Sequence, residues 1–168
     1  WKGTNTDIEG FISPLRTSEI DWKDREAVVL GCGGSARAVV AGLQQLHFAK
    51  ITLISRRQEK ITEFLNMIES SNSNIEKIKN TQITYESCLT NDKNISKKLS
   101  TADLIINTTP VGMSTSAKSD YVSKEMPLEK NIWEQLNSKA VLYDLIYTPQ
   151  PTSWLALGAE RGHICING

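Results

Sequence analysis

The residues with the clearest chemical use are small ones that follow a short apolar run, 28–30. Gly31, Gly33 and Ala36 have the spacing G-x-G-x-x-A, which is typical of turns that bind the pyrophosphate of a dinucleotide. The first glycine allows a tight turn, the second lets a phosphate approach the backbone, and the third small residue lets a helix pack closely on the strand. The start of that helix supplies N–H groups and a dipole that favour an anion. The pattern predicts a dinucleotide site, while a glycine-rich turn that binds nothing has the same spacing.

Two arginines follow the second apolar run, 51–55, where sheets that bind NAD usually carry an acidic residue for the ribose 2′-hydroxyl. Arg56 and Arg57 stand there instead, and their planar guanidinium groups suit a phosphate, which a carboxylate would repel. Lys60 adds a positive charge from the next predicted helix. We therefore expect NADP rather than NAD, with Arg56 as the main contact. The alternative is that one or both arginines end the strand in solvent.

Few residues are candidates for acting on a substrate. Asp7 is the only acid in the opening run Gly-Thr-Asn-Thr-Asp, and its residue type and place favour a helix N-cap over a catalytic group. Tyr147 follows a predicted strand, where it either presents a hydroxyl near the reacting centre or packs as an aromatic ring. His47 and His163 lie outside any motif, so we expect no metal site and no catalytic triad.

The composition excludes several classes of protein. Lys and Arg number 19, as do Asp and Glu, so no general attraction to nucleic acid or to an acidic membrane is expected. No apolar run approaches the roughly 20 residues of a membrane span. Cys32, Cys88 and Cys165 are scattered, which favours free thiols in a reducing compartment, the cytoplasm, over disulfides or zinc. Cys32 precedes a predicted helix, where a thiol can be acidified, but a small side chain tolerated between two glycines is the simpler interpretation.

Short apolar strands alternate with amphipathic helices, and this order positions the residues above. It predicts an α/β fold, a doubly wound Rossmann-type parallel sheet of about six strands in the order 3-2-1-4-5-6, with helices on both faces. Ligands of such sheets bind beyond the carboxyl ends of the strands. The expected strands are 26–30, 51–55, 82–85, 104–107, 140–145 and 163–166. The expected helices are 8–15 with a break near Pro14, 35–46, 58–70, 94–99, 132–136 and 152–161, while 75–81 is ambiguous.

The first 20 residues precede the first predicted strand of this sheet. We expect residues 21–168 to form the dinucleotide domain and residues 1–20 to be a connecting segment and helix that lead in from another domain. The sequence has no initiator methionine and stops at a glycine just after a strand-like run. We therefore interpret it as a fragment of a longer protein.

Five stretches of the chain together resemble shikimate dehydrogenases. Residues 3–10 resemble the family's G-x-N-T-D-x-x-G signature, and residues 31–38 resemble its G-x-G-G-x-x-R-A loop. Residues 107–113 look like its N-x-T-x-x-G-M stretch, and residues 144–152 look like its D-x-x-Y-x-P-x-x-T stretch. Residues 158–168 resemble the run that leads into its G-x-x-M-L segment. The resemblance covers nearly the whole chain in the family's order, and the motifs together are far more specific than any one of them.

The resemblance implies an NADP-dependent, reversible reduction of 3-dehydroshikimate to shikimate, in aromatic amino-acid biosynthesis. It implies that Asp7 is a catalytic and substrate-binding carboxylate rather than a cap, beside a lysine that serves in acid–base catalysis. Thr6 and Tyr147 are the other substrate contacts that it implies. The implied cofactor contacts are Gly31, Cys32, Gly33, Gly34 and Ser35 at the pyrophosphate, Ser55, Arg56, Arg57 and Lys60 at the 2′-phosphate and adenosine, and Thr108, Leu145 and Gly168 toward the nicotinamide.

Two features depart from the family. Its N-R-T after the second strand reads Ser55-Arg56-Arg57 here, and its catalytic lysine belongs to an N-terminal substrate domain that this sequence does not include. We therefore expect the chain alone to bind NADP without turning over shikimate, and to act with that domain of the same protein, as a monomer or a homodimer. The alternatives are a related quinate/shikimate or methylene-tetrahydrofolate dehydrogenase, or an NADP-binding module without catalysis.

Overall fold

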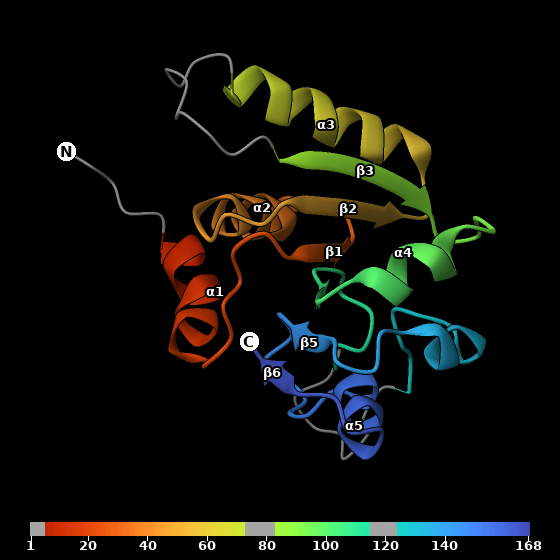
Figure 1. The fold of residues 1–168 in the computed structure, drawn as a ribbon. Helices are drawn as coiled ribbons and strands as arrows, with labels where there is room; N and C mark the ends of the chain where they lie inside the picture. Colours follow the sequence, from red (N-terminus) through yellow and green to blue (C-terminus); the bar gives the residue numbers. More distant parts are fainter. Residues whose placement is uncertain (1–5, 73–82, 115–123) are drawn as a thin grey trace.

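The structure, a computed structural model, describes residues 6–72, 83–114 and 124–168 and centres on a parallel β-sheet (Figure 1). The strands are β1 (Glu26–Leu30), β2 (Lys50–Ser55), β3 (Thr84–Leu89), β4 (Leu104–Asn107), β5 (Val141–Asp144) and β6 (Cys165–Asn167). They run in the order β3-β2-β1-β4-β5-β6, and each neighbouring pair is parallel. The predicted doubly wound order is therefore confirmed.

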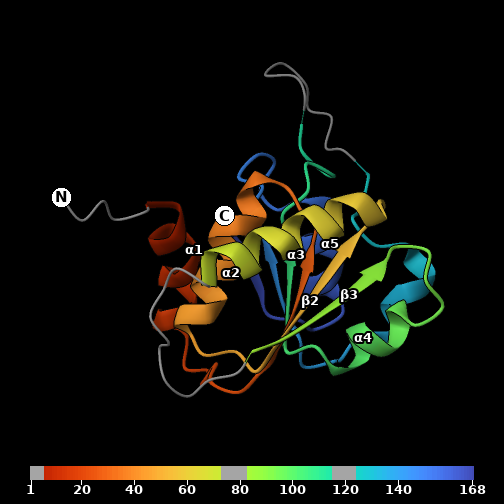
Figure 2. The same ribbon diagram turned by 90° about the horizontal axis from the view of Figure 1, so that it is seen from above.

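Helices cover both faces of this sheet, as predicted (Figure 2). They are α1 (Thr6–Thr17), α2 (Gly34–Gln45), α3 (Gln58–Asn72), α4 (Ile95–Thr101), the 3₁₀ helix η1 (Lys130–Gln135) and α5 (Ser153–Glu160). Ala27 and Val29 of β1 join the core beneath α1, α2 and α3, whereas Val28 and Leu30 join the core beneath α4, η1 and α5. A strand that is buried on both faces has a continuous apolar sequence, which is why the pattern located β1 at its observed bounds.

Helix α1 packs on the same core as the sheet. Its side chains Phe11, Ile12 and Leu15 are buried. The ring of Phe11 stacks on that of Tyr143 in β5, with the centroids 5.2 Å apart. Helix α2 meets α1 at Gly42, where an added β-carbon would lie 2.6 Å from side-chain atoms of both Phe11 and Ile12. The absence of a side chain at this position therefore lets the two helices approach closely.

Most element boundaries differ from the prediction by one or two residues, and three of the differences have a clear physical cause. Helix α1 does not break near Pro14 but continues to Thr17, because proline removes one hydrogen bond while the buried side chains around it keep the helix against the core. Strand β3 extends beyond the predicted 82–85 because it lies at the sheet edge, where exposed polar residues weaken the apolar pattern. The predicted helix 132–136 is the 3₁₀ helix η1. The ambiguous stretch 75–81 and residue 82 lie outside the described residues.

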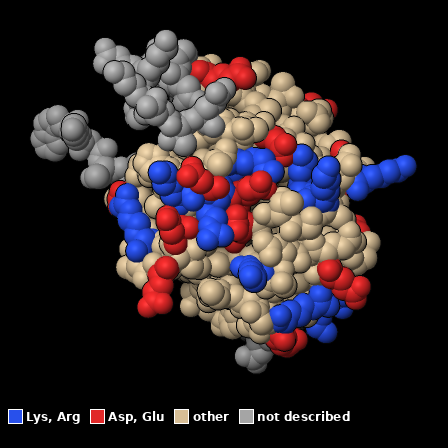
Figure 3. All heavy atoms as spheres, in the orientation of Figure 1, with Lys and Arg blue, Asp and Glu red and all other residues tan. Residues whose placement is uncertain are grey.

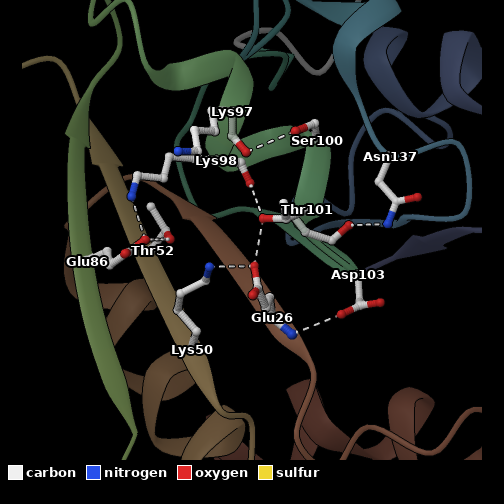
Figure 4. Close-up of polar contacts among 11 residues, drawn as sticks. Glu26, Lys50, Thr52, Glu86, Lys97, Lys98, Ser100, Thr101, Asp103 and Asn137 are labelled. Carbon is white, nitrogen blue, oxygen red and sulfur yellow. Dashed lines mark hydrogen bonds and ion pairs between the residues drawn. The ribbon is translucent and has the colours of Figure 1, made fainter.

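Ion pairs lie toward the amino ends of β1, β2 and β3 (Figure 4). The Lys50 ammonium is 2.7 Å from the Glu26 carboxylate, and the Lys98 ammonium is 2.6 Å from the Glu86 carboxylate. The hydrogen bond from Lys98 holds the pKa of Glu86 below its usual value. Asp103 accepts a hydrogen bond from the backbone N–H of Glu26 at 3.0 Å. Figure 3 shows acidic and basic side chains interspersed on this face, so its charges largely offset one another.

Candidate functional site

A pocket of about 720 Å³ lies at the carboxyl ends of the strands, away from the ion pairs at their amino ends. Its walls come from the glycine turn between β1 and α2, the turn between β2 and α3, the loop after β4, and residues 126–129 with Ile132. This is the edge at which doubly wound sheets bind their ligands. Most of the residues that the sequence assigned to a dinucleotide line this one pocket: Gly31, Cys32, Gly33, Gly34, Ser55, Arg56, Arg57, Lys60 and Thr108.

The first glycine of the turn is held between the ends of two strands. Gly31 has a φ of +104°, a conformation that residues with a side chain rarely adopt. An added β-carbon would lie 2.8 Å from Thr108 Oγ1 and 2.9 Å from Thr109 Cγ2, in the loop after β4. The Gly31 N–H donates to the carbonyl of Ile54 in β2 at 2.8 Å, and the Thr108 hydroxyl donates to the carbonyl of Leu30 at the same distance. Backbone conformation and close packing therefore both require glycine here.

The next two glycines are open to the pocket. No atom lies within 4 Å of the β-carbon that would be added at Gly33 or Gly34. Gly33 precedes α2 in an extended conformation and makes no side-chain cap to the helix. The first N–H groups of a helix have no partner within the helix, so those of α2 suit an anion from outside it. Ala36 is fully buried and brings α2 close to the sheet.

Positive side chains also line this pocket. Arg56 and Arg57 are exposed at the end of β2, and Arg37 is exposed on the first turn of α2. Among the described residues, none of these three guanidinium groups forms a hydrogen bond or an ion pair. Lys60 differs, because its ammonium group lies 2.6 Å from the carboxylate of Glu63, which also lines the pocket. Sequence reasoning matched Arg37 to the family loop but assigned it no role.

The thiol of Cys32 is not activated by its place before α2. Burial raises its pKa to about 11, so the thiol is protonated at neutral pH. The possibility that the helix start acidifies this thiol is therefore wrong, since burial disfavours the thiolate. The simpler interpretation, a small side chain between two glycines, fits the structure.

A second pocket of about 310 Å³ adjoins the first, since residues 108–110 line both. Ser35 at the start of α2, residues 113–114 and residues 145–148 complete its lining. Tyr147 has 75 % of its surface exposed, so the alternative that its ring packs at the strand end is wrong. The structure therefore brings Ser35, Leu145 and Tyr147 together beside the glycine turn. Gly168 lies against the backbone of Leu145, where an added β-carbon would be 2.7 Å from the carbonyl oxygen.

The loops that line this second pocket meet at a buried carboxylate. Asp144 ends β5, is fully buried, and accepts four hydrogen bonds. Asn107 Nδ2 donates at 3.1 Å, the Ile146 N–H at 3.0 Å and the Thr152 hydroxyl at 2.7 Å, and the Trp154 indole N–H is the fourth donor. Burial raises the pKa of Asp144, whereas the four donors favour its ionised form. The carboxylate therefore joins the end of β4, the loop after β5 and the start of α5.

Sequence reasoning located both of these loops but missed the carboxylate that connects them. Asn107 and Asp144 end neighbouring apolar strands, and their pairing explains why both motif stretches begin with a polar residue. The side-chain oxygen of Asn107, Oδ1, accepts from the Thr109 N–H at 3.0 Å and from the Thr109 hydroxyl at 2.7 Å, which shapes the loop after β4. Two polar residues that close adjacent buried strands are the signal that could have revealed this network.

The opening acidic residue is not brought into either pocket. Thr6 and Asp7 form the first turn of α1, exposed, and neither lines the two pockets described above. Gly3, Thr4 and Asn5 of the same motif lie outside the described residues. Within the described ranges, no group of three or more His, Cys, Asp or Glu side chains could hold a metal ion. No helix in those ranges is long and apolar enough to cross a membrane.

The chain is similar over its whole length to part of several curated proteins. No family model matches the chain. The NADP(+) shikimate dehydrogenase of Prochlorococcus marinus strain MIT 9312 is 42 % identical over 168 residues, covering 100 % of this chain and 53 % of that protein. The chain thus spans about half the length of the curated relatives that it matches.

Solved structures give the same result for the fold. A shikimate 5-dehydrogenase from Listeria monocytogenes, in complex with shikimate and NAD, has a TM-score of 0.79 at 21 % identity, covering 97 % of this chain and 52 % of that one. A shikimate dehydrogenase in complex with NADP+ has a TM-score of 0.71 at 28 % identity, covering 99 % of this chain and 51 % of that one. Sequence and fold together identify the chain as a homologue, over its entire length, of shikimate dehydrogenases, equivalent to about half of such a protein.

Proposed function

We propose that this chain is the C-terminal, NADP-binding half of a shikimate dehydrogenase, which reversibly reduces 3-dehydroshikimate to shikimate with NADPH. Residues 21–168 form the nucleotide domain, and residues 1–20 lead from an N-terminal substrate domain. The observation that carries the proposal is the first pocket, in which the glycine turn and the arginines after β2 face one cavity. The relatives that share the whole chain are named as NADP(+) enzymes, which supports the same cofactor here.

The two pockets fit the parts of a dinucleotide. The open space at Gly33 and Gly34 and the first N–H groups of α2 receive the pyrophosphate. Ser55, Arg56, Arg57 and Lys60 receive the ribose 2′-phosphate. The second pocket, with Ser35, Thr108, Leu145 and Tyr147, and with Gly168 against the Leu145 backbone, receives the nicotinamide and the substrate. The bound nicotinamide supplies or accepts the hydride.

The fold does not by itself choose between the two dinucleotides, since one structural neighbour holds NAD and the other NADP+. The residues after β2 determine whether NAD or NADP is preferred. Two guanidinium groups without a partner among the described residues attract a 2′-phosphate there, and residues 55–58 include no Asp or Glu to accept a 2′-hydroxyl. NADPH is therefore the cofactor that this pocket supports.

Replacing Arg56 with glutamine will weaken NADPH binding by about 10- to 100-fold, the range for a lost hydrogen bond to a charged group. NADH affinity will change little, because NADH has no 2′-phosphate. The dissociation constants are measured by fluorescence titration. Arg16→Gln is the matched control, since Arg16 is an exposed arginine of α1 that pairs with Glu9. Equal losses for NADPH and NADH, or tighter binding of NADH by the unmodified chain, would contradict this assignment.

Asp7, Thr6 and Tyr147 are the proposed substrate contacts, with Asp7 acting beside a lysine of the N-terminal domain. In the full-length protein, Asp7→Asn will lower kcat for shikimate oxidation by about 100-fold or more, the low end for a lost acid–base or positioning group. NADPH affinity will stay within two-fold, because neither pocket is lined by Asp7. Glu9→Gln is the control, an exposed acid on the same turn of α1.

The outcomes separate the possible roles of Asp7. Loss of NADPH binding or of folding in Asp7→Asn would make this residue structural. Appreciable shikimate oxidation by residues 1–168 alone would show that no lysine from another domain is needed. Oxidation of quinate in place of shikimate by the full-length protein would identify it as the related quinate dehydrogenase instead.

A further inference from the structure

The positive charges after β2 are not equally available to a ligand. The guanidinium groups of Arg56 and Arg57 have no partner among the described residues, whereas Lys60 is paired. Lys60 Nζ lies 2.6 Å from Glu63 Oε2, one helical turn along α3. Both members of the pair line the same pocket as the arginines. The pocket therefore contains a carboxylate beside the cations that would meet a phosphate.

We propose that Glu63 limits the preference of this pocket for 2′-phosphorylated dinucleotides, by holding Lys60 in an ion pair and by repelling the phosphate. This inference rests on the proposed NADP site and assigns a specificity-determining residue to it. Glu63 belongs to neither the glycine turn nor the strand end that sequence reasoning singled out. Its effect arises from its position one helical turn after Lys60.

Charge balance supports this role. The pocket is lined by four cationic side chains, Arg37, Arg56, Arg57 and Lys60, and by two acidic ones, Glu63 and Glu129, a net charge of two. A phosphate monoester carries about −1.5 to −2 near neutral pH, which this net charge roughly matches. Removing the Glu63 carboxylate raises the net charge to three and frees an ammonium group with three donors. NADPH will then be held more tightly and will be released more slowly.

The exposure of the pair determines the size of the effect. The side chains of Lys60 and Glu63 are 43 % and 63 % exposed. Exposed ion pairs are weak and are screened by salt. Glu63→Gln will therefore tighten binding of NADPH by about two- to five-fold, the range typical of such pairs. The gain will be largest at low ionic strength and will shrink as salt is added.

Fluorescence titration of the chain with NADPH and NADH, and calorimetry with 2′,5′-ADP and 5′-AMP, test the inference. Glu63→Gln should tighten binding of NADPH and 2′,5′-ADP and leave NADH and 5′-AMP within about 1.5-fold of their original affinities. Glu59→Gln is the matched control, because it removes the same charge from the exposed first turn of the same helix but does not line the pocket. It should leave all four affinities unchanged.

A double-mutant cycle shows whether Glu63 acts through Lys60. In a Lys60→Gln background, the gain from Glu63→Gln should fall to less than half, because the ammonium group that it frees is gone. An undiminished gain would overturn the ion-pair mechanism, and an equal gain from Glu59→Gln would overturn any specific role for Glu63. No gain at all, in a chain that binds NADPH, would overturn the inference and leave the NADP site intact. Failure of the unmodified chain to bind NADPH or 2′,5′-ADP would overturn both proposals.

Discussion

Replacing Asp144 with alanine will lower the free energy of unfolding by about 3–5 kcal/mol, because several buried donors lose their acceptor at a cost of about 1–3 kcal/mol each. The side chain is fully buried and accepts four hydrogen bonds. Alanine would leave buried donors on Asn107, Thr152 and Trp154 without an acceptor, and each unpaired group costs free energy. Because these donors come from β4, the loop after β5 and the start of α5, the lining of the second pocket will loosen as well.

Urea unfolding followed by circular dichroism measures this change. Asp144→Asn will have a smaller effect, because the amide keeps the shape and one acceptor oxygen. The control is Asp103→Ala, another aspartate beside the sheet, whose partly exposed side chain pairs with Arg25 and accepts a hydrogen bond from the Glu26 N–H, both at 3.0 Å. The ion pair and the hydrogen bond together should contribute no more than about 2 kcal/mol. Equal losses for Asp103→Ala and Asp144→Ala would show that the buried network is not the stabilising feature.

Alanine at two positions of the glycine turn should have different effects on stability and on ligand binding. Gly31→Ala will destabilise the chain by about 1–3 kcal/mol from backbone strain alone, because of the φ of +104°. Overlap of the new methyl group with Thr108 and Thr109 will add to this loss. Gly33→Ala will change stability by no more than about 0.5 kcal/mol, since its φ of −94° suits alanine and no atom lies within 4 Å of the added carbon.

Gly33→Ala will lower the affinity for NADPH although it leaves stability nearly unchanged. The methyl group of Gly33→Ala occupies the space proposed for the pyrophosphate, so binding of NADPH and NADH will fall together by about ten-fold or more, equivalent to at least 1.4 kcal/mol. Denaturation and fluorescence titration on the same samples measure both properties. Unchanged affinity for NADPH in a folded Gly33→Ala variant would show that the pyrophosphate does not bind at this turn. A Gly31→Ala variant of full stability would contradict the packing described above.

Most of the fold could be predicted because its signals are local. Strands such as β1 and β4 are buried on both faces, so each has a continuous apolar run that needs no partner to be recognised. The alternation of strands and helices then implies the parallel sheet and its order. Strand β3 was underestimated because an edge strand has less buried surface and a weaker pattern. The continuation of α1 through Pro14 was missed because it depends on packing against α2 and β5 rather than on the local sequence.

The sequence by itself determined the strand order, the glycine turn and the identity of the residues after β2, because each follows from composition and spacing within a short stretch. Only the tertiary structure decided how those stretches meet. It brought Thr108 against Gly31, buried Asp144 among donors from three segments, and left Tyr147 exposed. It also placed both members of the ion pair between Lys60 and Glu63 on the lining of the first pocket. These features depend on side-chain directions and on contacts between distant residues, which the spacing of residue types does not specify.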